Sequence, residues 1–278
     1  MESNPHGPLG NLNRTYQKPF LKQPNSKTFK VSTPMLNLPK SVDLRSSAKV
    51  DIYDQGATGS CSANAICTAY SLLNQLNQRP AINLSRLFVY YNSRVMDNTQ
   101  NIDAGAHLFN AFRTMQTNGC CLESMWPFYP NLLTIQPPLV CYQEGLNHCA
   151  EQQNSLLDPD NILNALKQCI VNNLPVVIGI LVYASFESQD TAQTGYVVMP
   201  NPETENLLGG HALVALGYDD NRNVVIVQNS WSENWGDHGF GYIPYAFISD
   251  PNLTSDCHAF TQTEIDRSMT PRCNVCGK

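Results

Sequence analysis

The chain is poor in charged residues, and its positive and negative residues do not form separate clusters. Charged side chains make up 14% of its 278 residues, and the formal net charge is −6. Because no cluster of lysine and arginine could follow a phosphate backbone, the composition argues against nucleic acid as the main partner. No apolar run approaches the ~18 residues that a membrane span needs. Residues 1–8 lack the charged-then-apolar order of a secretory signal. These absences predict a soluble, intracellular protein of the cytoplasm.

Ten cysteines are present, but nothing in the sequence directs the chain to an oxidising compartment where a disulfide framework would persist. Cys273 and Cys276 have the spacing of half a zinc site, and no second pair of that spacing completes it. A polar tail with two incidental thiols is the better interpretation, and we expect neither a metal nor another cofactor. Seven others are expected to be reduced thiols, several of them in the core: Cys67, Cys120, Cys121, Cys141, Cys149, Cys169 and Cys257.

Residues 1–38 differ in composition from the rest of the chain. They are rich in asparagine, proline, lysine and glutamine, and they hold too few apolar residues to form a core of their own. Two interpretations stay open for this segment, a disordered tail and a removable inhibitory segment. The chain becomes denser in apolar residues from Leu38, where we place a boundary.

Periodic patterns predict helices first and strands later. Helical spacing of apolar residues begins at Cys61 and ends at Arg79-Pro80, and a later helix is expected to start at Asp158-Pro159. Two more helices are expected over 84–96 and 105–117, and strands over 175–183, 212–218, 224–228 and 240–243. This order predicts an α+β fold with two lobes and a ligand site in the cleft between them. The expected divisions are a mainly helical lobe over 39–157, a mainly β lobe over 158–262 and a tail over 263–278.

Three residues far apart in the sequence could form a nucleophilic site. Cys61 stands at a predicted helix start, where unpaired N–H groups and the helix dipole favour the thiolate that attacks carbonyl carbon. His211 lies 150 residues further on and opens a predicted strand after two glycines. Asn229 lies 168 residues after the cysteine, and its side-chain carbonyl could orient the imidazole. The alternative is a small buried cysteine at a helix start, which the later His and Asn make the weaker interpretation.

Neighbouring residues could assist acyl transfer at this cysteine. Gln55 precedes Cys61 by six positions, and its amide together with the Cys61 backbone N–H could stabilise an oxyanion. Gly59 allows a substrate backbone to approach closely. Trp231 could shield the contact between histidine and asparagine from water, or it could simply belong to the core. Gln55 is a candidate oxyanion donor only because of its position before Cys61.

Taken in order, these motifs closely resemble the papain superfamily of cysteine peptidases, over residues 38 to 248. The segments that carry the resemblance are 38–45 (its mature start), 55–61 (its nucleophile loop), 209–211 (its histidine strand) and 229–242 (its asparagine segment). Thr58 and Ser62 depart from the family, which usually has there a disulfide-forming cysteine and a tryptophan. The run Ser62-Ala63-Asn64 and the later Asp103-Ala104-Gly105 are similar to a divergent branch known from microbes and large DNA viruses.

The resemblance implies a papain-like fold, with a helical lobe, a β-barrel-like lobe and the active-site cleft between them. It implies a thiol peptidase that cleaves protein or peptide substrates through a thiolate–imidazolium pair and an acyl-enzyme. Residues 1–38 would then be a short propeptide that inhibits its own chain until cut. We expect a monomer, located in the virion if the source is viral. The catalytic residues would be Cys61, His211, Asn229 and Gln55, and the substrate-binding residues Gly59, Ser60, Asp103, Gly105, Ala106, Gly210 and Trp231.

Two other functions stay open at this point. One is a catalytically silent relative that only binds peptide or a protein partner. The other is a different thiol acyl-transfer enzyme, such as an amidase, a transglutaminase-like enzyme or a deubiquitinase. Because a binding module has no need of a nucleophile, a base, an orienting amide and an oxyanion donor together, the intact set favours an enzyme.

Overall fold

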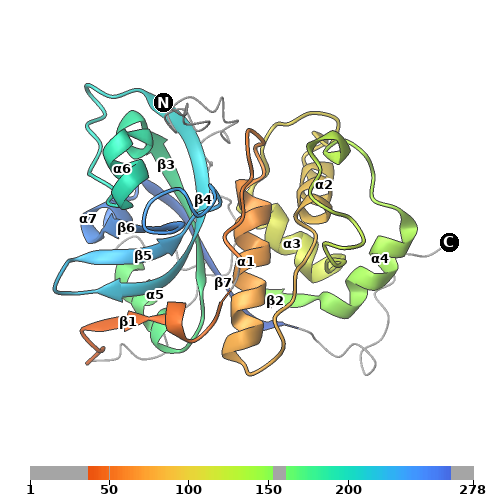
Figure 1. Ribbon diagram of the computed structural model, residues 1–278, viewed down its shortest axis with the longest axis horizontal. Coiled ribbons are helices and arrows are strands. Elements are labelled where there is room, and N and C mark those ends of the chain that lie inside the picture. The colour runs from red at the N-terminus through yellow and green to blue at the C-terminus, as the bar shows by residue number, and fades with distance from the viewer. Residues whose placement is uncertain (1–36, 50, 153–160, 264–278) are drawn as a thin grey trace, which may run out of the picture.

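The computed structural model describes residues 37–49, 51–152 and 161–263, and it has two lobes that lie side by side (Figure 1). One lobe holds most of the helices and the other holds most of the sheet. Helix α1 (Cys61–Leu76) runs along the boundary between them, and its residues from Cys61 to Asn74 are buried. A helix buried along nearly its whole length packs against both lobes and fixes the position of its first residue relative to each.

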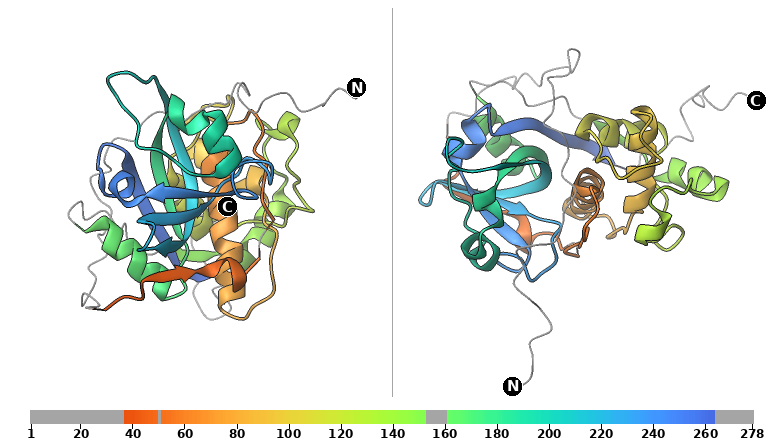
Figure 2. Two further views of the ribbon diagram at one scale, coloured as in Figure 1. Left: turned by 60° about the vertical axis from the view of Figure 1, so that its left-hand side comes forward. Right: turned by 90° about the horizontal axis from the view of Figure 1, so that it is seen from above.

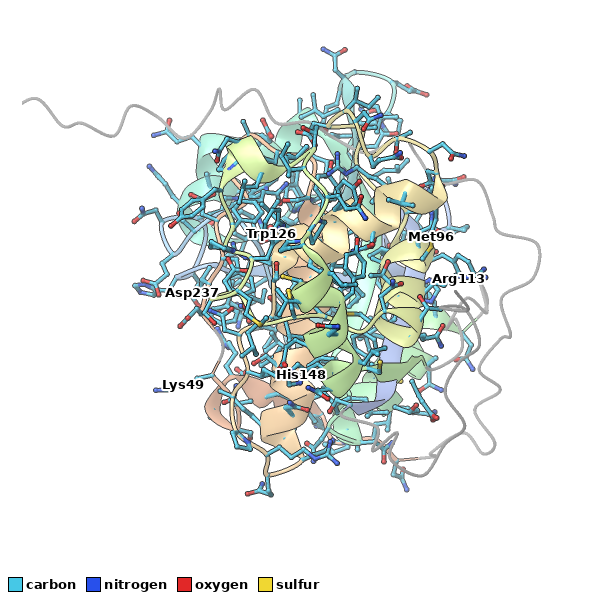
Figure 3. All side chains as sticks on the ribbon, turned by 90° about the vertical axis from the view of Figure 1, so that its right-hand side faces the viewer. Lys49, Met96, Arg113, Trp126, His148 and Asp237 are labelled. Atoms are coloured by element: carbon cyan, nitrogen blue, oxygen red, sulfur yellow. The ribbon has the colours of Figure 1, made fainter. Side chains whose placement is uncertain are left out.

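The helical lobe surrounds α1 with short helices. Ser85 begins one of them by accepting a hydrogen bond from the Phe88 backbone N–H at 3.1 Å, an N-cap that satisfies one of the unpaired groups of a helix start. Side chains fill the space among these helices when the lobe is seen from outside (Figure 3). Its other elements are α2 (Arg86–Met96), α3 (Leu108–Thr117), the 3-10 turn η2 (Pro130–Leu132), α4 (Leu139–Gly145), the 3-10 turn η3 (Leu146–His148) and β2 (Ala150–Gln152).

The sheet is antiparallel throughout, in the order β2-β7-β3-β4-β5-β6, with β1 paired to β4. Short helices lie against it in Figures 1 and 2. The strands are β1 (Ser41–Asp43), β3 (Val176–Tyr183), β4 (Leu207–Asp219), β5 (Val224–Gln228), β6 (Phe240–Pro244) and β7 (Thr254–Thr263). The accompanying helices and turns are η1 (Leu44–Ser46), α5 (Ile162–Val171), η4 (Ala184–Glu187), α6 (Gln189–Thr194) and α7 (Tyr245–Ser249).

The α+β fold of two lobes predicted from the sequence is confirmed, and so are all four helices and all four strands. The helix expected to close at Arg79-Pro80 ends earlier, at Leu76, because the chain turns at Gln78 with a φ of 60°. The expected start at Asp158-Pro159 lies outside the described residues, and α5 is described from Ile162. Strands β1, β2 and β7 and helices α4, α6 and α7 were not predicted.

Two strands cross the division expected at residue 157. Strand β1 comes from the N-terminal side but pairs with β4 in the β lobe. Strand β7 comes from the end of the described chain, and it pairs both with β3 and with β2 beside the helical lobe. One large apolar core, which includes Tyr70 of α1 and Leu213 of β4, is continuous through both lobes. These crossings tie the two lobes together.

Six cysteines predicted to be reduced are buried and outside any disulfide in the described part of the chain: Cys67, Cys120, Cys121, Cys141, Cys169 and Cys257. Cys149 is buried as well. Among the described residues, no three His, Cys, Asp or Glu side chains are arranged to hold a metal ion. No helix within that part has the length and apolarity for a membrane crossing.

Candidate active site

Cys61 is the first residue of α1 and is only 1% exposed. Burial raises the pKa of its thiol to about 12, because a thiolate loses its hydration there. The backbone N–H groups of Ala212, Ser62 and Cys61 itself act in the opposite direction and stabilise the anion. The contact with Ala212 places the sulfur beside the residue that follows His211. A thiolate at this position therefore needs a neighbouring cation, and His211 is the residue directly before Ala212.

His211 and Asn229 are brought together by the β4–β5 hairpin. His211 lies on β4 and Asn229 directly follows β5, whose last residue, Gln228, pairs with Val214. The two side chains are hydrogen bonded, with 2.8 Å between His211 Nε2 and Asn229 Oδ1. The same oxygen accepts the Ser230 backbone N–H at 2.8 Å, which fixes the orientation of the amide. Because the amide oxygen can only accept, His211 Nε2 donates this hydrogen bond and carries the proton.

Aromatic rings enclose the contact between His211 and Asn229. The Trp231 ring lies 4.8 Å from the imidazole, centroid to centroid, and is 3% exposed. Phe186 meets Trp231 edge to face at 5.5 Å and stacks against Trp235 at 5.8 Å. Because water is kept away, the histidine–asparagine hydrogen bond is stronger than it would be in an open site. Trp231 has the shielding position expected of it, and Phe186 is a member of this enclosure that the sequence did not reveal.

Gln55 is held at the entrance to α1 by both ends of its amide. Its Nε2 donates to the Thr58 carbonyl at 2.8 Å, and its Oε1 accepts from Ser230 Oγ at 2.7 Å. Since the amide nitrogen carries two hydrogens, one remains for a developing oxyanion. Ser230 thus contacts Gln55 through its hydroxyl and Asn229 through its backbone N–H. This serine connects Gln55 to Asn229, and sequence reasoning had not singled it out.

We expect Gln55→Ala to lower kcat on peptide substrates by about a hundredfold, with KM little changed. Removing one oxyanion donor costs ~3–4 kcal/mol of transition-state stabilisation in well-studied enzymes, and the loss is confined to the charged transition state. Steady-state kinetics would measure it. Ser230→Ala is the matched control, because it keeps the donor and removes only its orienting bond, so a smaller loss is expected. A kcat within threefold of the wild-type value in Gln55→Ala would contradict this role.

The residues expected to border a substrate fall into two groups. Gly59 and Asp103 meet directly, since the Gly59 backbone N–H donates to both carboxylate oxygens at 3.0 and 3.1 Å. Gly105 is buried next to them, as is Ala106. Ser60 faces inward, with its hydroxyl 2.7 Å from that of Thr58. The second group lies across the lobe boundary and consists of Gly210 on β4 and Trp231 beyond β5.

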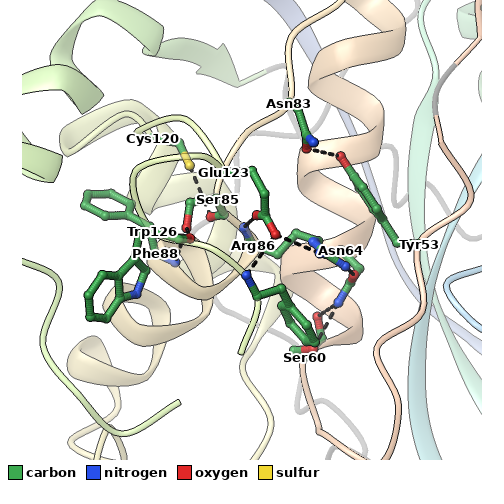
Figure 4. A network of polar contacts seen from close by, with 11 residues as sticks. Tyr53, Ser60, Asn64, Asn83, Ser85, Arg86, Phe88, Cys120, Glu123 and Trp126 are labelled. Carbon is green, nitrogen blue, oxygen red and sulfur yellow. Dashed lines mark hydrogen bonds and ion pairs between the residues drawn. The ribbon is translucent and has the colours of Figure 1, made fainter. Parts of the chain in front are cut away.

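A network of hydrogen bonds and one ion pair connects α2 to the first turn of α1 (Figure 4). The Arg86 guanidinium pairs with Glu123 at 2.8 Å and donates to Asn64 Oδ1 at 3.3 Å. Asn64 Nδ2 in turn donates to the carbonyl and the hydroxyl of Ser60, both at 2.9 Å. Ser60 is the residue immediately before Cys61, so the network reaches the nucleophile. An arginine at the start of α2 gave no sign in the sequence that it would be buried.

Replacing Arg86 by methionine should lower the free energy of unfolding by roughly 3 kcal/mol. Arg86 and Glu123 are 12% and 14% exposed, and removal of one partner leaves the other charge buried without compensation. Urea denaturation of the purified variants would measure the change. The double variant Arg86→Met/Glu123→Gln removes both charges and should recover part of the loss. Equal stability of Arg86→Met and the wild type would show that the pair contributes nothing.

A buried cysteine beside a histidine that an asparagine orients, with an amide donor at the same helix start, defines a thiol hydrolase. The model of a family described as papain family cysteine protease matches residues 38–258. This chain belongs to that family of cysteine-type peptidases. It is 35% identical over 209 residues to an uncharacterized peptidase C1-like protein, L477, of Acanthamoeba polyphaga mimivirus, an alignment that covers 73% of this chain and 67% of that protein.

Two solved structures are similar to this one. Xylellain, a cysteine protease from Xylella fastidiosa, superposes with a TM-score of 0.80 at 28% identity, covering 89% of this chain and 96% of that one. Digestive procathepsin L 3 of Tenebrio molitor superposes with a TM-score of 0.65 at 20% identity, covering 91% and 78%. The papain-like fold and the cysteine peptidase class expected from the motifs are therefore confirmed.

Proposed function

We propose that this chain hydrolyses peptide bonds through an acyl-enzyme on Cys61, with His211 as the acid and base. The observation that carries the proposal is the hydrogen bond from His211 Nε2 to Asn229. It supports Nδ1 as the nitrogen that exchanges the proton, because Nε2 is engaged by Asn229 and the next residue, Ala212, turns its backbone N–H toward the Cys61 sulfur. Gln55 Nε2 and the Cys61 backbone N–H would be the donors to the oxyanion.

The reaction follows from these positions in two stages. The Cys61 proton passes to His211 Nδ1, and the thiolate attacks the peptide carbonyl carbon. His211 then returns the proton to the amine nitrogen as the C–N bond breaks, which leaves a thioester on Cys61. In the second stage water gives a proton to His211 and attacks the thioester carbonyl. The carboxylic acid is released, and the sulfur recovers its proton from the imidazole.

We further propose that the chain is made as a zymogen and that residues 1–38 inhibit it. Support comes from the burial of the reacting side chains, since Cys61 is 1% exposed and His211 is 2% exposed. Procathepsin L 3, which shares the fold, is as its name says a proform. The monomeric state and the intracellular location remain predictions.

Removal of residues 1–38 tests the inhibitory role. We expect the truncated protein to turn over a fluorogenic peptide at least about tenfold faster than the full-length chain. Incubation of the full-length chain at mildly acidic pH should yield a product that begins near Leu38, which N-terminal sequencing or intact mass would detect. A Cys61→Ala chain should stay uncut if maturation is autocatalytic. Equal turnover by full-length and truncated protein would refute inhibition while leaving the peptidase proposal intact.

A further inference from the structure

We propose that Asp103 is a positioning residue, which holds the loop of residues 54–60 in place before Cys61 and is not itself a substrate contact. The inference rests on the proposed peptidase function only for its kinetic readout. Asp103 belongs to a second loop, residues 100–106, which the sequence suggested as a border of the substrate pocket. Its carboxylate is turned instead toward the loop that leads into α1.

The contact between the two loops is made by both carboxylate oxygens. The Gly59 backbone N–H lies 3.0 Å from Asp103 Oδ1 and 3.1 Å from Oδ2. Hydrogen bonds that involve an ionised acceptor are roughly twice as strong as neutral ones. Gly59 stands only two residues before the nucleophile, so a shift of this N–H shifts the start of α1. In that segment Cys61 must present both its sulfur and an N–H to the same carbonyl group.

Tyr90 of α2 fixes the direction of the carboxylate. Its hydroxyl donates a short hydrogen bond to Asp103 Oδ1 and accepts the Gly105 backbone N–H at 3.0 Å. One phenol therefore holds both the acid and the backbone two residues after it. Burial raises the pKa of Tyr90, and the nearby charge of Asp103 raises it further, so the hydroxyl keeps its proton and remains a donor.

Arg94, one turn further along α2, fixes the other end of the 100–106 loop. It is fully buried, donates to the carbonyl of Ile102, and lies with its guanidinium 3.9 Å from the centre of the Tyr90 ring. Among the described residues, the titratable and charged groups that feel the charge of Asp103 include Tyr90 and Arg94 from α2 and Cys61 from α1. Helix α2 thus holds the Asp103 carboxylate in place, and the carboxylate holds the loop that leads to Cys61.

The two loops also touch too closely to move independently. A β-carbon added at Gly59 would lie 3.0 Å from the Gly105 nitrogen, 3.1 Å from Asp103 Oδ1 and 3.1 Å from the Tyr90 hydroxyl. A side chain there would have to push its neighbours back by a few tenths of an ångström, so the glycine lets the loops approach until the carboxylate reaches the backbone N–H. The negative charge so placed opposes ionisation of Cys61. Asp103 therefore has two separable effects, on geometry and on charge.

The test compares Asp103→Asn with Tyr90→Phe. Asp103→Asn removes the charge and one of the two oxygens that accept from Gly59, whereas Tyr90→Phe keeps the carboxylate and removes one bond that aims it. We expect Asp103→Asn to lower kcat on a peptide substrate by roughly tenfold to a hundredfold with KM little changed. In the same variant, the pH profile of Cys61 alkylation by iodoacetamide should move to lower pH by roughly half a unit. Tyr90→Phe should lower kcat without moving that profile.

Asp97→Asn, which removes the same charge from the C-cap of α2, is the control for a general charge effect and should change neither readout. Wild-type kcat together with an unmoved alkylation profile in folded Asp103→Asn would overturn the proposal. If that variant fails to fold, wild-type kcat in Tyr90→Phe would overturn it instead. The alkylation profile needs no substrate, so it distinguishes failure of this proposal from failure of the proposed peptidase function.

Discussion

Cys61→Ala should abolish peptide hydrolysis, with kcat/KM falling by at least about a thousandfold. The sulfur is the atom that bonds to the substrate carbonyl, and no acyl-enzyme can form without it. Any rate that remains above that of the uncatalysed reaction in water would come only from substrate binding and from the oxyanion donors, as in other enzymes that have lost their nucleophile. The same change should prevent labelling by an epoxide-type thiol trap. Truncated protein lacking residues 1–38 is the form to assay, because the proposed inhibitor is then absent.

Cys67→Ala is the matched control for this result. Cys67 lies on the same helix and is equally buried, but it has no part in the proposed reaction. Its replacement should lower stability modestly through the lost packing and leave epoxide labelling intact. Full peptidase activity in folded Cys61→Ala protein would remove the mechanism, and equal loss of activity in both variants would assign the effect to folding.

His211→Gln should lower kcat by a similar factor and should also change the pH at which the sulfur reacts. In the wild type, an imidazolium beside Cys61 favours the thiolate by Coulomb attraction, so alkylation should be measurable near neutral pH. Without that cation nothing offsets the effect of burial, which raises the pKa of the thiol. Iodoacetamide should then react at an appreciable rate only above roughly pH 10. The alkylation rate measured against pH gives the answer.

Asn229→Ala tests how much the orientation of the imidazole contributes, because the imidazole itself is still present. The imidazole stays in this variant but loses the 2.8 Å bond at Nε2. We expect a smaller loss of kcat than in His211→Gln, with alkylation near neutral pH retained in part. Wild-type alkylation at pH 6 in His211→Gln would show that the cysteine ionises without the histidine, and the proposed ion pair would then be wrong.

The parts of the site that the sequence predicted are those carried by contiguous motifs. Cys61 follows a glycine-rich loop and begins an apolar helical pattern, and His211 begins a long apolar strand. Asn229 follows the next strand of the hairpin. The pairing of β4 with β5 turns this sequence order into contact. Motif order also indicated the two lobes, because helical spacing gives way to apolar strand runs in the second half.

What the sequence could not show depends on contacts between distant segments. Strand β7 was missed because its buried positions include polar residues such as His258, whose Nε2 lies 3.2 Å from Asp256 Oδ1. A three-residue strand such as β1 has no pattern of its own and forms only by pairing with β4. Arg86 is buried because Glu123, 37 positions later, neutralises it. The direction of the Asp103 carboxylate is likewise set by Tyr90 and Gly59.

The most direct test of the central claim is to trap the acyl group itself. Truncated enzyme is mixed with an activated ester of a short peptide, quenched in acid within the first turnover, digested and examined by mass spectrometry. We predict one added acyl mass on the peptide that contains Cys61, formed at least as fast as product appears. Steady turnover of the ester with no acyl group on Cys61, or with the group on another residue, would contradict the account.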